Sequence, residues 1–158
     1  MVSLTEPNHN ISSIHDVVLR LGINKLQSWA SVIALTNASD KPSELLTTSL
    51  IRAKFCESIG SIEKDLSKDS YFMVGLFSTL DTIMDQPLDE ILSGLSFKEE
   101  IKSALLNKTG NLGKALATVK NIESRKNDFI PPAGLTPSEV TKIYLEAMEF
   151  TNKLNIKP

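Results

Sequence analysis

The side chains of this sequence that first suggest chemistry are an adjacent histidine and aspartate, His15 and Asp16. Imidazole and carboxylate together can bind a divalent metal ion, which in turn can activate water for phosphoester hydrolysis. A metal site, however, needs three or more ligands that converge on one point. The other histidine is His9, and no acidic residue stands at a ligand spacing such as H-x-x-x-H or H-E-x-x-H. We therefore interpret His15-Asp16 as part of a solvated helix surface.

Two further features could carry chemistry but fit structural roles better. Cys56 is the only cysteine, so neither an internal disulfide nor a thiolate metal cluster can form. It falls on an apolar helix face without a neighbouring histidine, and we expect it to pack as a small hydrophobic residue. The stretch "GNLGKA", residues 110–115, resembles a phosphate-binding loop but lacks the G-x-x-x-x-G-K-[ST] spacing and a preceding strand. It predicts the start of a helix.

The elements that must position these residues are predicted to be helices. Apolar residues recur at i, i+3, i+4 and i+7 along most of the chain, and no segment alternates as a strand would. The apolar stripes lie in residues 14–21, 26–33, 46–60, 72–83, 87–94, 101–105, 116–122 and 140–154. "TGNLG", residues 109–113, is expected to separate two of these helices, and "NDFIPPAGL" to be a connector. The predicted architecture is an all-α bundle with mostly short connections.

Helix starts are written into the sequence at two places. Ser96 with Glu99, and Thr136 with Glu139, have the spacing of a reciprocal capping box, and Pro137 suits the first position of its helix. Among the aromatic residues, Trp29 shares a predicted inward stripe and is expected in the core. Phe129 and the adjacent Ile130 lie in the predicted connector, where they either plug the end of the bundle or offer a docking edge.

Composition excludes several classes of protein. The 158 residues are 41% hydrophobic and 23% charged, as in an ordinary soluble domain. A formal net charge of −2 provides no basic field, so we expect no nucleic acid as partner. The longest apolar runs are too short to cross a bilayer, and residues 1–10 lack the features of a secretory signal. We expect a cytoplasmic protein, or a cytoplasmic piece of one, that does not bind membranes.

Four stretches carry a resemblance to a known family. They are "SI..VV..LG...L..WA" at 13–30, "SDKPSELL" at 39–46, "RAKFCE" at 52–57 and "GLFSTLD" at 75–81. They resemble the HDOD domain, and more narrowly the HDOD domain joined to an EAL domain in bacterial cyclic-di-GMP signalling proteins. The resemblance implies a helical bundle of the HD/HDOD type over residues 11–154, after a flexible segment at 1–10. It also implies that the partner is an EAL domain in cis or another signalling protein.

The same resemblance implies that the metal site of active HD phosphohydrolases has been lost. Their metal helix reads like G-L-L-H-D-I-G, and on "GLFSTLD" the histidine falls on Ser78 and the aspartate on Thr79. Hydroxyl groups do not hold a divalent transition metal as imidazole and carboxylate do. The preceding stretch "TTSLIRAKF", residues 47–55, contains no histidine either, and Asp81 stands where active enzymes have glycine. We therefore expect no catalytic residue, no metal and no cofactor, and a vestigial pocket lined by Ser78, Thr79 and Asp81.

Three hypotheses follow for function. The leading one is a non-catalytic module that regulates cyclic-di-GMP signalling through contacts with another domain or protein. The alternative is a sensor that binds a nucleotide or metabolite in the vestigial pocket. An active metal phosphohydrolase would require ligands that the sequence does not offer. The first helices of the family are not found before "ISSI", which indicates either a fragment or a shortened form. In a fragment, we expect exposed apolar surface that favours association with another copy or with an upstream domain.

Overall fold

The computed structural model describes residues 27, 30–32, 34, 44–64, 68–95, 97–126, 128 and 130–154. The predictions made for residues 1–10, for His15 and Asp16, for Trp29 and for Phe129 lie outside these residues. The division of the chain into segments 1–10 and 11–154 therefore stays a prediction.

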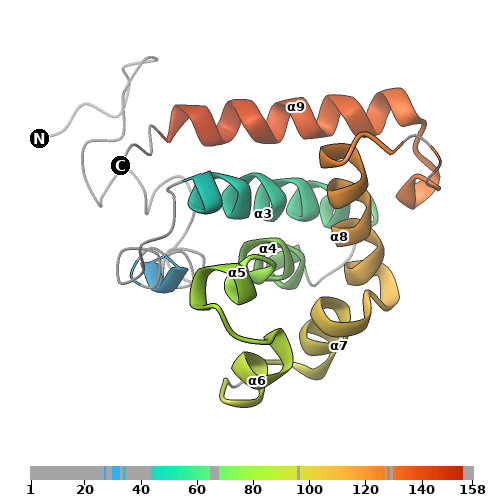
Figure 1. The fold of residues 1–158 in the computed structure, drawn as a ribbon. Helices are drawn as coiled ribbons and strands as arrows, with labels where there is room; N and C mark the ends of the chain where they lie inside the picture. Colours follow the sequence, from blue (N-terminus) through green and yellow to red (C-terminus); the bar gives the residue numbers. More distant parts are fainter. Residues whose placement is uncertain are drawn as a thin grey trace, which may run out of the picture.

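The described part of the chain is helical and contains no strand, so the predicted all-α class is confirmed (Figure 1). None of its helices combines the length and the apolar character that a bilayer span requires. The elements are α3 (Glu44–Ile62), α4 (Lys68–Phe77), α5 (Leu80–Met84), α6 (Leu88–Ser93), α7 (Glu99–Asn107), α8 (Gly110–Glu123), the 3-10 turn η1 (Pro132–Gly134) and α9 (Pro137–Lys153).

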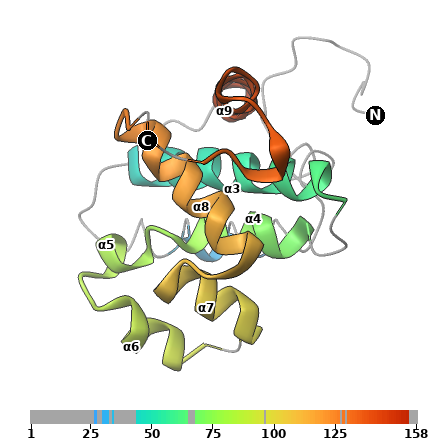
Figure 2. The same cartoon turned by 90° about the vertical axis from the view of Figure 1, so that its right-hand side faces the viewer.

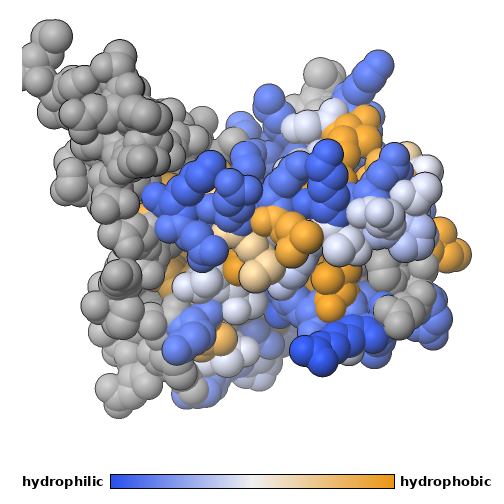
Figure 3. Space-filling model, turned by 90° about the horizontal axis from the view of Figure 1, so that it is seen from above, coloured by the Kyte–Doolittle hydropathy of each residue, from blue (hydrophilic) through white to orange (hydrophobic). Residues whose placement is uncertain are grey.

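Helix α3 lies at the centre and packs against α4, α8 and α9 (Figures 1 and 2). Helix α9 lies on one side of α3 and α4 on the other side (Figure 1), and α8 passes across α3 and α4, as Figure 2 shows. The side chains between these helices are apolar and almost fully buried; among them are Leu50, Ala53, Phe55 and Ile59 of α3, Phe72, Val74 and Leu76 of α4, Leu116 and Val119 of α8, and Val140 and Ala147 of α9. Seen from above α9, the surface is mostly hydrophilic with scattered apolar patches (Figure 3).

A glycine sets the distance between α3 and α4. A β-carbon placed on Gly75 would overlap the carbonyl group of Arg52 and lie 2.5 Å from the backbone nitrogen of Ala53. Only a residue without a side chain allows the two backbones to approach so closely. The close crossing brings the residues that follow Gly75 next to the middle of α3.

The predicted single helix over 72–83 is wrong, because the structure has two helices there. Helix α4 ends at Phe77, α5 begins at Leu80, and Ser78 and Thr79 form the junction. The Ser78 hydroxyl donates a hydrogen bond of 2.7 Å to the carbonyl oxygen of Gly75. Such a side-chain bond competes with the backbone for its acceptor and favours a break in the helix. An apolar pattern that continues across the break does not reveal it.

Two predicted helix boundaries, at the start of α7 and between α7 and α8, are also corrected. Helix α7 begins at Glu99 after Lys98, without a side-chain cap, so a capping box with Ser96 does not start this helix; Ser96 itself lies outside the described residues. The prediction that "GNLGKA" starts a helix is confirmed, because α8 begins at Gly110, but the separator from α7 is only Lys108 and Thr109 and is shorter than the predicted "TGNLG". A β-carbon on Gly113 would lie 2.8 Å from the α-carbon of Lys108, so glycine is what lets α8 start directly against the end of α7.

Other predicted boundaries are confirmed. Thr136 caps α9 by accepting a hydrogen bond from the backbone of Glu139, whose carboxylate accepts one from the backbone of Thr136 in return. Pro137 occupies the first turn, as expected. Helix α6 follows Pro87 and is capped by Gly94.

Candidate functional site

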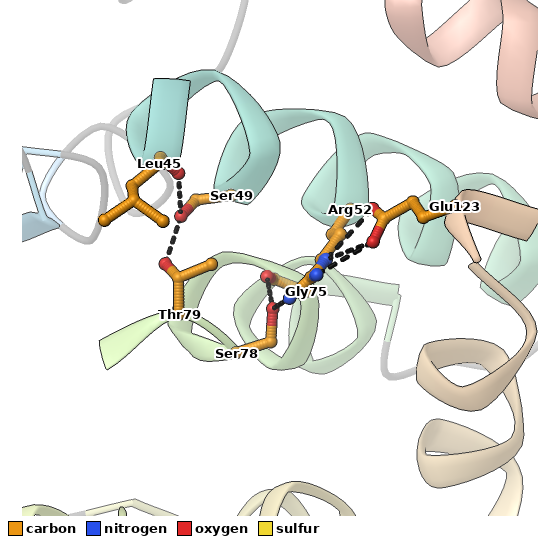
Figure 4. Close-up of polar contacts among 7 residues, drawn as sticks. All are labelled: Leu45, Ser49, Arg52, Gly75, Ser78, Thr79 and Glu123. Carbon is orange, nitrogen blue, oxygen red and sulfur yellow. Dashed lines mark hydrogen bonds and ion pairs between the residues drawn. The ribbon is translucent and has the colours of Figure 1, made fainter. Parts of the chain in front are cut away.

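A group of buried and half-buried polar side chains lies where α3, the α4–α5 junction and α8 meet. It consists of Ser49, Arg52, Ser78, Thr79 and Glu123, which we call the polar cluster (Figure 4). Ser49 and Arg52 are three residues apart on α3 and thus share the helix face that looks towards α4. Ser78 and Thr79 reach this face because the break after Phe77 turns them towards α3.

The centre of the polar cluster is an ion pair between Arg52 and Glu123. Nε of Arg52 lies 3.0 Å from Oε1 of Glu123, and Nη2 lies 2.8 Å from Oε2, so the guanidinium holds the carboxylate with two nitrogens. The Arg52 and Glu123 side chains are 15% and 22% exposed. This two-pronged geometry is the strongest form of such a pair, and the partial burial weakens its screening by water. The pair joins α3 to the end of α8.

The hydroxyl groups of the polar cluster are engaged with their neighbours. The Ser78 oxygen accepts a hydrogen bond of 3.1 Å from Nη1 of Arg52 and donates to the carbonyl oxygen of Gly75. Ser49 donates to the carbonyl oxygen of Leu45 at 2.8 Å and is hydrogen-bonded to the hydroxyl of Thr79. Since Ser49 uses its proton on Leu45, Thr79 is the donor between the two hydroxyls.

Asp81, the third residue predicted for the vestigial pocket, does not join the polar cluster. Ser78 and Thr79 are buried in it, but Asp81 is exposed in the first turn of α5. Its charge acts on Lys120 of α8, which lies one turn before Glu123. Burial lowers the pKa of Lys120, as do the charges of Arg52 and Lys108, while Asp81 and Glu123 act in the opposite direction. Ser78 and Thr79 are thus buried in the polar cluster, whereas Asp81 is exposed outside it, and the vestigial pocket stays a prediction.

Arg52 and Glu123 are the members of the polar cluster whose roles the sequence reasoning missed. Arg52 is part of the "RAKFCE" stretch, and it shares the inward side of its helix with apolar residues. A charge at such a position requires a partner, and this signal was available. Glu123 stands 71 residues further on, so sequence spacing could not identify it as that partner.

The cysteine beside the polar cluster behaves as predicted. Cys56 lies one turn after Arg52 and is fully buried, and burial raises the pKa of its thiol to about 12. The charge of Arg52 lowers this pKa and that of Glu123 raises it, both by less than the effect of burial. A thiol that stays protonated is a poor nucleophile and a poor metal ligand.

The structure also bears on two other features considered in the sequence, metal ligands and the apolar connector residue Ile130. In the described part of the chain, no three His, Cys, Asp or Glu side chains converge so as to hold a metal ion. Ile130 is 92% exposed, so it does not plug the end of the bundle. The docking edge proposed as the alternative for this loop stays open.

Comparison with known proteins finds similarity to parts of two longer bacterial proteins. The chain is 32% identical over 153 residues to the uncharacterized protein YuxH of Bacillus subtilis, a match that covers 93% of this chain and 37% of YuxH. It is 32% identical over 109 residues to the cyclic di-GMP phosphodiesterase CdgJ of Vibrio cholerae, covering 68% of this chain and 25% of CdgJ. No family model and no solved structure matches the chain. The chain is thus similar to about a third of YuxH and a quarter of CdgJ, the latter named as a cyclic di-GMP phosphodiesterase.

Proposed function

We propose that this chain is a non-catalytic HDOD module that regulates cyclic-di-GMP signalling by contacting another domain or protein. The observation that carries the proposal is the polar cluster. Ser78 and Thr79, which the resemblance aligns with the metal-binding histidine and aspartate of active enzymes, are both committed to hydrogen bonds inside the bundle.

The charges of the polar cluster support a role without a metal. The guanidinium of Arg52 is a fixed positive charge that donates to Ser78 and holds Glu123. A divalent cation at Ser78 would be repelled by Arg52, and the carboxylate of the polar cluster, Glu123, is already paired with that arginine. The polar cluster therefore has the chemistry of a structural contact that joins α3, the α4–α5 junction and α8.

The similarity to CdgJ supports the cyclic-di-GMP system as the setting. The phosphodiesterase activity in that name belongs to CdgJ, and this chain matches a quarter of its length. A regulatory module acts through the surface it presents to its neighbour, and we propose an EAL domain in cis, or a separate signalling protein, as that neighbour.

A graft into CdgJ tests the regulatory role. The segment of CdgJ that is similar to this chain is deleted, and this chain is fused in its place; an unrelated helical domain in the same position is the control. We expect the graft to change the rate of cyclic-di-GMP hydrolysis severalfold relative to the deletion, and the unrelated domain to leave it unchanged. Equal rates for both fusions would contradict regulation in cis.

A hydrolysis assay tests the proposal that the chain is not catalytic. The purified chain is incubated with cyclic-di-GMP and with a simple phosphodiester in the presence of Mn²⁺ or Fe²⁺. We expect no hydrolysis above that of the metal alone. Turnover that depends on the chain would contradict the proposal and favour an active phosphohydrolase.

The sensor hypothesis at Ser78, Thr79 and Asp81 is less well supported by the geometry. Two of these residues are buried and already hydrogen-bonded, and the third lies on the rim. A nucleotide there would have to break those bonds and compensate for them. A rise in melting temperature on addition of cyclic-di-GMP, without turnover, would favour the sensor over the interaction module.

A further inference from the structure

A second feature lies beside the α4–α5 junction. It is a pocket of about 560 Å³ lined by residues of α4, α5 and α6, by Phe97 before α7, and by Gln27 and Ser31. We call it the apolar pocket. Its wall is formed by Met73, Phe77, Leu80, Met84, Ile91 and Phe97.

The wall is suited to an apolar molecule. The rings of Phe77 and Phe97 are tilted against each other with their centroids 4.9 Å apart and make one rigid side. Met73 and Met84 are only partly buried, and their flexible thioethers adapt to ligands of different shape. A volume of this size lies within the range of small-molecule sites.

Charge defines the class of ligand more narrowly. The polar residues among the described lining are Gln27, Ser31, Gln86 and Glu90. Glu90 is the single charged residue in this described lining, and it is acidic. Because an anion would meet Glu90 without any described basic partner in the pocket, a nucleotide or a carboxylate is disfavoured. Amide and hydroxyl groups can still bind an uncharged polar head.

We propose that the apolar pocket binds a small, uncharged and mainly apolar molecule with a hydrogen-bonding head. The site is separate from the polar cluster and does not depend on the regulatory role proposed above. Phe77 and Leu80 line the pocket, and they immediately flank Ser78 and Thr79 of the polar cluster. A ligand in the apolar pocket would therefore contact the two residues next to the α4–α5 junction, which the polar cluster stabilises through Ser78 and Thr79.

Nile red and a pair of ten-carbon competitors test the ligand class. Nile red is neutral and fluoresces in apolar surroundings, so we expect saturable binding to the chain. 1-Decanol should displace the dye at least about tenfold more effectively than decanoate, which has the same length but carries a negative charge. Equal displacement by the two competitors would overturn the charge argument, and the absence of saturable binding would overturn the site.

Gly94 offers a way to block the pocket without strain. It lines the pocket, its φ is −87°, and a β-carbon there would meet only the carbonyl oxygen of Ile91 at 3.7 Å. We expect Gly94→Phe to weaken dye binding at least about tenfold. Ser93→Phe is the matched control, because Ser93 is exposed and does not line the pocket, and this variant should bind as the unchanged chain does.

A second variant and a second measurement keep the test decisive. If circular dichroism shows that Gly94→Phe is misfolded, Met84→Glu places a charge on the partly buried wall and should also weaken dye binding about tenfold. Binding by both folded variants as in the unchanged chain would refute the proposal. A concentration-dependent dimer that Gly94→Phe abolishes, together with no displacement by 1-decanol, would instead identify a second copy as the occupant.

Discussion

Helix α3 is held on two sides by different physical means. On the side of α4 and α8, backbones touch at Gly75 and the polar cluster supplies directed bonds. On the side of α9, side chains meet: the rings of Phe55 and Tyr144 form an edge contact at 6.4 Å, and Nζ of Lys54 lies 4.6 Å from the centre of the Phe150 ring.

This difference indicates how well each of the two interfaces of α3 tolerates amino-acid substitutions. An interface of apolar side chains can repack around a substitution at modest cost. An interface of touching backbones and directed polar bonds cannot, because each partner has one position that satisfies it. We expect the α4 side of α3 to be the sensitive one, and the predictions below test this from the largest expected effect to the smallest.

The contact at Gly75 should be the least tolerant. Gly75→Ala places a β-carbon onto the backbone of Arg52 and Ala53, and we expect it to lower the free energy of unfolding by about 3 kcal/mol in urea denaturation. Gly94→Ala is the control, because its β-carbon has ordinary van der Waals contact only, and it should change stability by less than about 0.5 kcal/mol. Equal effects of the two variants would mean that α4 can move away from α3 freely.

The ion pair should show coupling rather than two independent contributions. Arg52→Met leaves the carboxylate of Glu123 partly buried without its partner, and we expect a loss of about 2 kcal/mol, discounted for the partial exposure of the pair. Adding Glu123→Leu to Arg52→Met removes the unpaired charge, and the double variant should recover about 1 kcal/mol. Urea denaturation of the two single variants and the double variant completes the cycle. Strictly additive losses would show that the pair does not act as a unit.

These two interfaces also differ in how far the sequence predicts them. The α9 side follows from apolar spacing and from the Thr136 capping box, because both are local patterns with a known meaning. The α4 side does not. The break at Ser78 depends on a hydroxyl that bonds to Gly75, and the partner of Arg52 lies on a distant helix.

The candidate site shows the same limit. Ser78 and Thr79 were singled out by a family resemblance, and the structure buries both of them in the polar cluster. Asp81 was grouped with them because the same motif aligns it with a glycine of active enzymes, yet it is exposed in the first turn of α5. A helix break changes the direction of every residue after it, so spacing across an unrecognised break misplaces side chains.

Cys56, next to the ion pair, shows how burial changes the pKa of a thiol and thereby the pH dependence of stability. Burial raises the pKa of the Cys56 thiol from 9.0 to about 12, so the folded state keeps its proton when the unfolded state loses it. The contribution of this group is therefore fully present below pH 9 and declines as pH rises from about 9 towards about 12, by at most about 1.4 kcal/mol per pH unit.

The measurement is the stability of the unchanged chain and of Cys56→Ala at pH 7 and pH 10. The variant is less stable at both values because it leaves a small cavity. We expect the gap between the two proteins to narrow by about 1.4 kcal/mol at pH 10, since only the unchanged chain has the thiol to titrate. A constant gap would mean that the thiol titrates alike in both states, as an accessible group would.

The smallest effect is expected at the start of α9, on the tolerant side of the comparison. Thr136→Ala removes the hydroxyl that accepts the hydrogen bond of 3.2 Å from the backbone of Glu139, and we expect a loss of about 1 kcal/mol in urea denaturation. Thr141→Ala is the matched control: its exposed hydroxyl donates to the carbonyl of Pro137 within the helix, and the change should cost less than about 0.5 kcal/mol. If Thr136→Ala instead cost as much as Gly75→Ala, the α9 side would also depend on a single directed contact, and the distinction between the two faces of α3 would fail.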